Sequence, residues 1–341
     1  MRVVEASNAT LSADLFILED LSSAIYCKVG YFYNVGGNGG SLGETVSALL
    51  IVQGGEWKHR SWSISWSRRP TDSNSSGWSA TSVRAGKLTP EATMPFSHHS
   101  HSGQFCPHAT DTLEEMVQSA ISRSMQTFAL TEHMPRHDQD LYPEEVAIGW
   151  NHEEMERNHQ AFVSEAIRLR AKYQGKIQLL IGFESEWIRP GSLDLISHCL
   201  RCHSWDLFVG SVHHVHCKPI DYDQADFDAA RQLAGGSEEQ LFIDYFDAQY
   251  AMLQATLPPI IGHFDLIRLK SKDPDRDLRE WKSVWERIRR NLEFIADYGG
   301  LLEINFASLR KGLQDPYPRG EIAQVKQNLQ HWLHQFLLTD Q

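Results

Sequence analysis

From residue 94 onward, short apolar runs that resemble strands alternate with longer stretches of helical period. Alternation of this kind predicts a parallel sheet, either closed into a barrel or doubly wound with helices on both faces. The seven strand-like runs are FSHHSHS at 96, TFALT at 127, IQLLIGF at 177, DLFVGS at 206, PIIGH at 259, GLLEIN at 300 and FLLT at 336.

Helical stretches separate these runs. The first is expected from residue 112, where Asp111 followed by Glu114 has the spacing of a capping box. A shorter helix is expected after the third strand. The remaining helices are expected near 153–172, from about 238, near 278–297 and near 320–334.

Residues 1–93 differ from the rest of the chain. They contain 8 basic and 8 acidic residues, whereas 94–341 contains 24 basic and 36 acidic residues. The tryptophan- and serine-rich stretch at 57–82 shows neither a strand period nor a helix period, and the glycine cluster GGNGGSLG lacks the dinucleotide-binding spacing. We therefore expect 1–93 to be a poorly ordered, non-homologous extension, with Met94 as the natural start of the domain over 94–341.

Composition narrows the class of protein. The formal net charge of −12 over 341 residues argues against a nucleic-acid-binding face, which needs clustered lysine and arginine. Five scattered cysteines indicate a reducing compartment, and neither a secretory signal nor a membrane-length apolar run is visible. These features predict a cytoplasmic metabolic protein with no membrane or nucleic-acid partner, and they leave its oligomeric state open.

Histidines and carboxylates recur where the predicted strands end. In parallel α/β folds the active site lies at the carboxyl ends of the strands. Two histidines in a His-x-His pattern on a strand face the same side, so His99 and His101 can bind one ion while His98 faces away. The successive strand ends carry His99 and His101, Glu132 and His133, Glu184 and Glu186, His213 and His214, and His263 and Asp265.

This recurrence predicts a metal site. A single histidine is usually a structural residue, but five successive strand ends with imidazole or carboxylate groups form a ligand set. Mixed histidine and carboxylate ligands suit zinc, manganese or iron. The set exceeds the needs of one ion, so we expect two or three ions, with Glu184 as a bridging carboxylate and His108 as a further candidate ligand.

A centre with several ions is typical of hydrolases that act on phosphate esters. A phosphate substrate also needs a cation outside the metal ligands. Arg310, in the stretch ASLRKG, is the best candidate, because a guanidinium group binds phosphate oxygens in a bidentate way. Lys311 and Arg268 are weaker candidates, because each is more often a solvated surface charge.

One further motif resembles a cofactor-attachment site. The stretch from Cys199 to His203 matches the C-x-x-C-H pattern of haem attachment. It lies at the end of a helical stretch, in a chain without a visible export signal. We therefore expect ordinary helix residues there, with haem attachment or a small zinc site as minor alternatives.

Six stretches resemble the polymerase-and-histidinol-phosphatase (PHP) family, and its fungal-type histidinol-phosphatases in particular. The resemblance covers nearly all of 94–340. The stretches are HHSHSG at 98, LTEHMPR at 130, IGFESE at 181, VGSVHHV at 209, IGHFDL at 261 and LRKGLQDPYP at 309.

The resemblance implies a distorted seven-stranded β/α barrel with a trinuclear metal centre. It implies hydrolysis of L-histidinol phosphate to L-histidinol and phosphate in histidine biosynthesis. Arg310 matches a phosphate-binding arginine of the family, and we expect Tyr142 and His214 to lie in the substrate pocket. The residues that match metal-binding positions are His99, His101, His108, Glu132, His133, Glu184, His213 and His263.

The end of the sequence departs from the family pattern. In the family, the seventh strand ends in an Asp-x-His pair that completes the metal centre, whereas this sequence ends HQFLLTDQ. Asp340 lies beside the expected position, but an offset of one residue turns a strand side chain to the other face. We therefore expect a domain that lacks its C-terminal end, with fewer ions and reduced activity. The alternatives are a catalytically impaired PHP protein and a related phosphoesterase or nuclease.

Overall fold

A computed structural model describes residues 25–27, 41–53, 56–68, 78–85 and 96–325. The chain divides into two compact units: Met1–Pro95 with Arg123–Met125, and Phe96–Ser122 with Gln126–Gln341. The predicted seventh strand at 336 and most of the helix predicted near 320–334 lie outside the described residues.

The described part of 1–93 forms an antiparallel sheet in the order β1-β2-β3-β4. Its strands are β1 (Ile25–Cys27), β2 (Ser41–Gln53), β3 (Glu56–Arg68) and β4 (Trp78–Ala85). The tryptophan- and serine-rich stretch, in which we found no strand period, thus contains most of β3 and most of β4. Backbone hydrogen bonds hold an antiparallel ladder, so a ladder can form without an alternating side-chain pattern. That 1–93 is a non-homologous extension stays a prediction.

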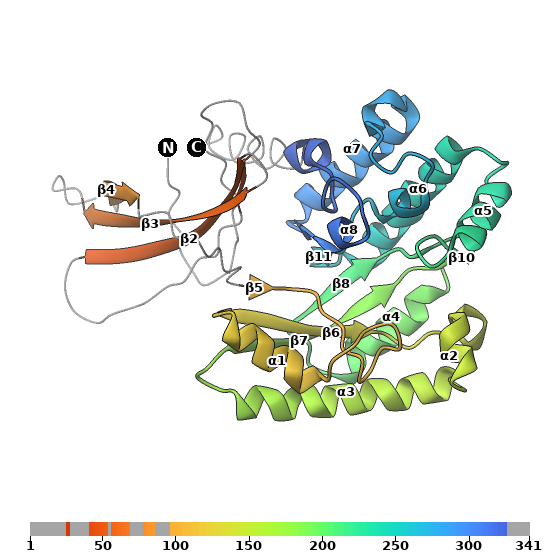
Figure 1. Ribbon diagram of the computed structural model, residues 1–341, viewed down its shortest axis with the longest axis horizontal. Coiled ribbons are helices and arrows are strands. Elements are labelled where there is room, and N and C mark those ends of the chain that lie inside the picture. The colour runs from red at the N-terminus through yellow and green to blue at the C-terminus, as the bar shows by residue number, and fades with distance from the viewer. Residues whose placement is uncertain (1–24, 28–40, 54–55, 69–77, 86–95, 326–341) are drawn as a thin grey trace. The chain divides into compact units, whose positions relative to one another are not determined.

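The second unit is built on a parallel sheet with the strand order β12-β11-β8-β7-β6-β5 (Figure 1). Six strands belong to it in the part of the chain that the structure describes. This α/β architecture with a parallel sheet confirms the predicted fold class, whereas the seventh strand of the barrel stays a prediction. The strands are β5 (Phe96–Ser97), β6 (Thr127–His133), β7 (Gln178–Glu186), β8 (Leu207–Ser211), β11 (Ile260–Ile261) and β12 (Leu301–Leu302).

Helices connect the strands of this sheet. Figure 1 shows α3 running along β6 and β7, with which it is in contact. The helices are α1 (Leu113–Ser122), α2 (Pro143–Ala147), α3 (His152–Lys172), α4 (Ser192–Cys202), α5 (Gln224–Leu233), α6 (Glu238–Thr256), α7 (Lys282–Asp297) and α8 (Ala307–Arg310). Short 3-10 helices are η1 (Asp138–Asp140), η2 (Leu266–Lys270) and η3 (Leu278–Glu280). None of the helices described has the length and apolar character needed to cross a membrane.

The start of α1 corrects one sequence prediction. The capping box lies one residue further along than Asp111 and Glu114. Thr112 Oγ1 accepts a hydrogen bond from the Glu115 N–H at 3.3 Å, and the Glu115 carboxylate accepts one from the Thr112 N–H at 2.8 Å. Both pairs have the required spacing of three residues, so spacing alone could not choose between them.

The central strand β7 owes its position to close packing. Its apolar run is buried from Ile181 to Phe183, as expected for a strand covered on both faces. Gly182 pairs with Leu207 of β8, and a Cβ atom at Gly182 would lie 2.5 Å from the Leu207 carbonyl oxygen. A side chain there would push β8 away from β7, so the glycine fixes the strand that carries Glu184 and Glu186.

A short hairpin follows β8. It pairs β9 (His214–Val215) with β10 (Lys218–Pro219), and its turn residues His216 and Cys217 have positive φ angles of 53° and 60°. Two consecutive positive φ angles are typical of a type I′ turn. The hairpin places His213 and His214 at the carboxyl edge of the sheet.

Candidate metal centre

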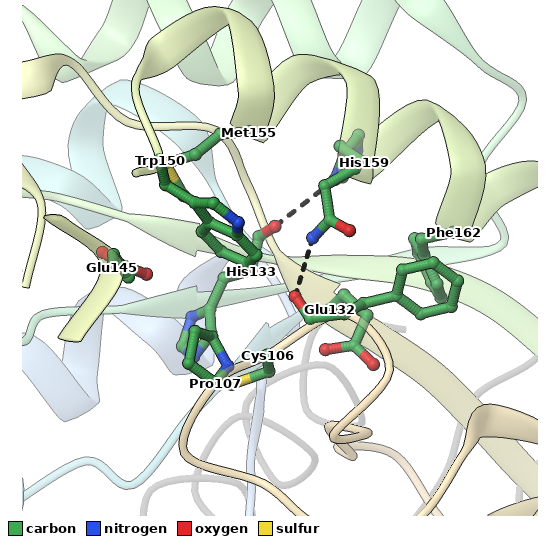
Figure 2. A pocket seen from close by; sticks show the side chains of 11 residues that line it. Cys106, Pro107, Glu132, His133, Glu145, Trp150, Met155, His159 and Phe162 are labelled. Carbon is green, nitrogen blue, oxygen red and sulfur yellow. Dashed lines mark hydrogen bonds between the residues drawn. The ribbon is translucent and has the colours of Figure 1, made fainter. Parts of the chain in front are cut away.

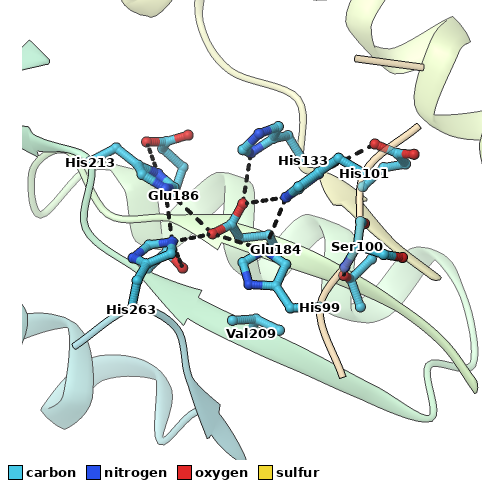
Figure 3. A network of polar contacts seen from close by, with 12 residues as sticks. His99, Ser100, His101, His133, Glu184, Glu186, Val209, His213 and His263 are labelled. Atoms are coloured by element: carbon cyan, nitrogen blue, oxygen red, sulfur yellow. Dashed lines mark hydrogen bonds and ion pairs between the residues drawn. The ribbon is translucent and has the colours of Figure 1, made fainter. Parts of the chain in front are cut away.

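The carboxyl ends of the parallel strands bring most of the predicted ligands together (Figure 3). In the β6–β7 register, His133 lies opposite Glu184. The strand ends contribute His99 and His101 after β5, Glu132 and His133 on β6, Glu184 on β7, His213 after β8 and His263 after β11.

The premise behind the His-x-His prediction was wrong, while the prediction that His99 and His101 bind one ion stays a prediction. The strand β5 ends at Ser97, so His99 and His101 lie on the loop that follows it. Their Nε2 atoms are nevertheless 2.9 Å apart, which places both imidazoles on one side of the chain. The loop is fixed by Ser100, whose hydroxyl donates to the Ala129 carbonyl at 2.7 Å.

The carboxylate of Glu184 lies at the middle of the cluster and is 1% exposed. Among the described residues, imidazoles from four other strand ends surround its two oxygens. The distances are 3.3 Å to His99 Nε2, 3.2 Å to His101 Nε2, 3.0 Å to His133 Nδ1, 3.4 Å to His213 Nε2 and 2.9 Å to His263 Nε2. This central position is the one expected of a bridging ligand.

The cluster fits divalent ions better than it fits hydrogen bonds alone. Besides the His99–His101 contact, the Nε2 atoms of His213 and His263 lie 3.2 Å apart. Several buried atoms lack a hydrogen-bond partner among the described residues: Nδ1 of His101, His133 and His263, and Oε2 of Glu132 and Glu184. Two ligand atoms of a tetrahedral zinc ion, each about 2.0–2.1 Å from it, lie about 3.3 Å apart. The separations in the cluster are close to that value.

Within the described residues, two groups of three residues have ligand atoms that lie within 4.8 Å of one another. One consists of His99, Glu184 and His263. The other consists of His101, Cys106 and His133. Each group offers donors that divalent ions such as zinc, manganese or iron can accept.

The charges in the cluster keep Glu184 ionised and some imidazoles neutral. Burial by itself raises the pKa of Glu184, but the nearby histidines, His99 above all, hold that pKa well below its ordinary value. Burial and the neighbouring His101 lower the pKa of His133 well below its ordinary value. An ionised carboxylate beside a neutral imidazole is the protonation state in which these groups bind metals.

Two predicted ligands lie at the edge of the cluster. Oε1 of Glu132 accepts hydrogen bonds from the Ser102 N–H at 2.8 Å and the Ser102 hydroxyl at 2.7 Å, and its Oε2 lies 3.4 Å from Nδ1 of His101. His108 is further out: its side chain is 44% exposed and its ring centre lies 5.5 Å from that of His133. The structure thus brings Glu132 to the site and His108 to its margin.

The predicted pocket residues Tyr142 and His214 pack against each other. Both are buried, and their ring centres lie 5.6 Å apart. The ring centre of His108 lies 6.2 Å from that of Tyr142, so the three side chains follow one another beside the histidine cluster.

The cationic candidates differ from one another. Arg310 is exposed at the end of α8, and none of the hydrogen bonds or ion pairs found among the described residues involves it. Arg268 is 1% exposed, lies 3.1 Å from the Asp265 carboxylate and donates to the Asp315 carbonyl at 2.7 Å. The interpretation of Arg268 as a surface charge was therefore wrong. This arginine holds together two loops, and Asp265 serves that pair instead of the metal cluster.

Sequence reasoning gave no role to four residues in or around the cluster. Glu303 follows β12, and its Oε2 lies 3.2 Å from His99 Nδ1 and accepts a hydrogen bond from the His263 N–H at 3.0 Å. Glu303 is the first polar residue within the run GLLEIN, directly after Leu301 and Leu302, and this position was a usable signal. Glu186 was noticed without a role. Cys106 and Arg136 lie on loops, where no helix or strand period indicates which way a side chain faces.

A small cavity lies behind His133 (Figure 2). Its volume of about 10 Å³ is room for one water molecule and excludes a substrate. His159 lines it. The Nδ1 atom of His159 lies 3.3 Å from the His133 carbonyl oxygen, and its Nε2 has no partner among the described residues.

The C-x-x-C-H stretch lies on and just after α4. Cys199 is buried, whereas Cys202 is exposed with its Sγ 3.2 Å from His198 Nε2. The indole of Trp205 donates to the Cys199 carbonyl at 2.7 Å, which closes the end of the helix. The metal-ligand groups found in the described residues do not include this stretch.

Comparison with known proteins identifies the family. The family model described as the PHP domain matches residues 97–307. The chain is 44% identical over 234 residues to a Schizosaccharomyces pombe protein named as a probable histidinol-phosphatase, covering 68% of this chain and 76% of the relative. It is 32% identical over 276 residues to the histidinol-phosphatase of Saccharomyces cerevisiae, covering 72% and 82%. The chain therefore belongs to the PHP family, and its curated relatives include fungal histidinol-phosphatases.

Solved structures agree with the fold. HisK from Listeria monocytogenes matches with a TM-score of 0.60 at 23% identity, covering 69% of this chain and 91% of that one. Histidinol phosphate phosphatase from Lactococcus lactis, solved with zinc, L-histidinol and phosphate, matches with a TM-score of 0.51 at 20% identity, covering 69% and 81%.

Proposed function

We propose that this chain is a metal-dependent phosphomonoesterase that hydrolyses L-histidinol phosphate to L-histidinol and phosphate. The observation that carries the proposal is the carboxylate of Glu184 with imidazoles from four strand ends within 3.4 Å of it. The two fungal relatives named as histidinol-phosphatases support this substrate. We also propose two or three ions of zinc, manganese or iron, and a fold of the seven-stranded β/α barrel type.

Each side chain has a proposed task. Divalent ions at such a centre make water a nucleophile at neutral pH and neutralise phosphate charge. The side chains that would hold these ions are His99, His101, His108, Glu132, His133, Glu184, His213 and His263. Hydrolysis breaks the bond between phosphorus and the histidinol oxygen, which leaves with a proton, and forms a bond to the water oxygen. Arg310 binds the phosphate oxygens, and Tyr142 and His214 contact the organic part of the substrate.

The test is phosphate release by the purified chain with added manganese or zinc. L-histidinol phosphate, p-nitrophenyl phosphate and a single-stranded oligonucleotide are compared. We expect the highest kcat/KM with L-histidinol phosphate. Preferential cleavage of the oligonucleotide would favour a nuclease of the same fold. Metal binding without cleavage of any ester would favour a catalytically impaired protein.

A further inference from the structure

Three buried charged residues lie beside the metal centre, and none of them is among the proposed ligands. Arg136 is 1% exposed, and Glu186 and Glu145 are each 2% exposed. Arg136 lies three residues after His133, on the loop that follows β6. A buried charged group is costly unless it is paired, so a buried set of this kind has a structural or a functional reason.

Glu186 connects this set to the metal cluster. Its Oε1 lies 2.8 Å from Nδ1 of His213 and 3.2 Å from Nδ1 of His214. The other ring nitrogen of His213, Nε2, faces the cluster at 3.4 Å from Glu184. A carboxylate that accepts the Nδ1 proton fixes the tautomer in which Nε2 is free to bind a metal. Glu186 thus orients His213 toward the centre, as Figure 3 shows.

Arg136 connects Glu186 to the segment that carries Tyr142. Its Nη1 donates to Oε2 of Glu186 at 2.9 Å, and its Nη2 donates to Glu145. The second oxygen of Glu145 accepts the backbone N–H of Tyr142 at 2.8 Å. The guanidinium carbon also lies 4.8 Å from the centre of the Tyr142 ring. One arginine therefore contacts the support of His213 and the segment that carries Tyr142.

Electrostatics agree with this geometry. Burial raises the pKa of Glu186, but His213, His214 and Arg136 together hold that pKa well below its ordinary value. Without the guanidinium, Glu186 and Glu145 would be two buried carboxylates with one fewer positive charge between them.

We propose that Arg136 is a positioning residue that acts through Glu186 to hold His213 as a metal ligand and His214 with Tyr142 at the substrate. The inference rests on the metal centre of the proposed function. It assigns roles to Arg136, Glu186 and Glu145 that neither the family resemblance nor the strand-end pattern supplied. The direct effect is on metal binding, so it can be measured without substrate.

The experiment is a zinc titration against a chromophoric chelator, with the wild-type chain, Arg136→Gln, Glu186→Gln and the double variant. We expect each single variant to bind zinc about 10- to 100-fold more weakly, the usual cost of removing a partner of a metal-bound histidine. The double variant should bind zinc no more weakly than Glu186→Gln alone, because both changes interrupt the same chain of contacts from Arg136 through Glu186 to His213. Arg168→Gln is the control, since Arg168 also pairs with two carboxylates, Glu114 and Glu165, but is exposed.

The titration results distinguish whether Arg136 supports metal binding through Glu186. Wild-type zinc affinity in a folded Arg136→Gln chain, or additive losses in the double variant, would overturn the inference. If the arginine variants do not fold, Glu186→Gln, which keeps the side-chain volume, decides the matter by the same titration. Failure of the wild-type chain to hydrolyse L-histidinol phosphate while it still binds zinc would refute the proposed substrate, and the titration would still support or overturn the role of Arg136.

Discussion

His99 and Glu303 join the two edge strands of the parallel sheet. His99 follows β5 and Glu303 follows β12, yet Nδ1 of the first lies 3.2 Å from Oε2 of the second. A flat sheet would hold the ends of its outermost strands far apart, since neighbouring strands are about 4.8 Å apart. The contact therefore requires strong curvature, which brings the strand ends around one centre.

Replacing Glu303 tests the importance of this contact. We expect Glu303→Gln to bind zinc about 10- to 100-fold more weakly, because His99 loses the carboxylate that orients its ring. Glutamine keeps the side-chain size and an oxygen that can accept the His263 N–H. The measurement is a zinc titration. Glu321→Gln serves as a control, since Glu321 pairs with Arg319. Equal zinc affinities for Glu303→Gln and the wild type would contradict the prediction.

Arg310 is expected to act on substrate binding. Arg310→Ala should raise KM for L-histidinol phosphate about 10- to 100-fold, because a charge-assisted hydrogen bond contributes about 1.5–3 kcal/mol. Steady-state kinetics measure this change. Lys311→Ala removes a neighbouring exposed charge and should leave KM within about twofold of the wild type. Similar effects from both substitutions would point to general electrostatic attraction instead of a specific contact.

Removal of metal should affect stability as well as activity. Dialysis against a chelator is expected to abolish phosphate release and to lower Tm by about 10 °C, because ligands at about 1,000 times Kd add about 4 kcal/mol to the free energy of unfolding. Added zinc or manganese should restore both. A Tm that does not change on chelation would argue against a metal centre built into the fold.

His159 should contribute to the pH dependence of stability. Burial, the largest effect, lowers its pKa from 6.5 to about 4. Its neutral form is favoured in the folded state, so its contribution is present above pH 6.5 and is lost as pH falls toward 4. Between pH 7 and pH 5 this loss is about 2 kcal/mol. Urea unfolding at both pH values should show a smaller decrease for His159→Gln than for the wild type. An identical decrease would refute the assignment.

Leu257 occupies a backbone conformation that suits asparagine or glycine. It ends α6 with φ 44° and ψ 56° and is 50% exposed. A left-handed conformation costs a residue with a Cβ about 1–2 kcal/mol, and asparagine tolerates it better. We expect Leu257→Asn to raise Tm by about 2 °C in a thermal melt. Leu233→Asn is the control, since Leu233 is 58% exposed but lies within a helix. An equal rise in Tm for both variants would mean that the gain comes from replacing an exposed leucine with a polar residue and not from the backbone conformation of Leu257.

Strand ends were the most predictable part of this molecule. The apolar runs predicted at 127, 177, 206, 259 and 300 correspond to β6, β7, β8, β11 and β12, because a strand buried in a parallel sheet needs a continuous apolar run. The helix α5 was not predicted. Its amphipathic pattern is short, and it follows the β9–β10 hairpin, which has no clear signal in the sequence. Arg136 and Arg268 show the limit of such reasoning. Both are buried, and only the fold reveals the carboxylates that accompany them.

The position of Glu184 makes metal binding depend on completed pairing of the strands. Its imidazole neighbours range from His99 to His263 in the sequence, so they meet only after the strands between them have paired in register. An ion can then be retained only by a chain that has finished this pairing, and its binding energy becomes part of the folding energy. Loss of metal would consequently lower the free energy of unfolding of the completed fold and leave more of the protein open to proteolysis.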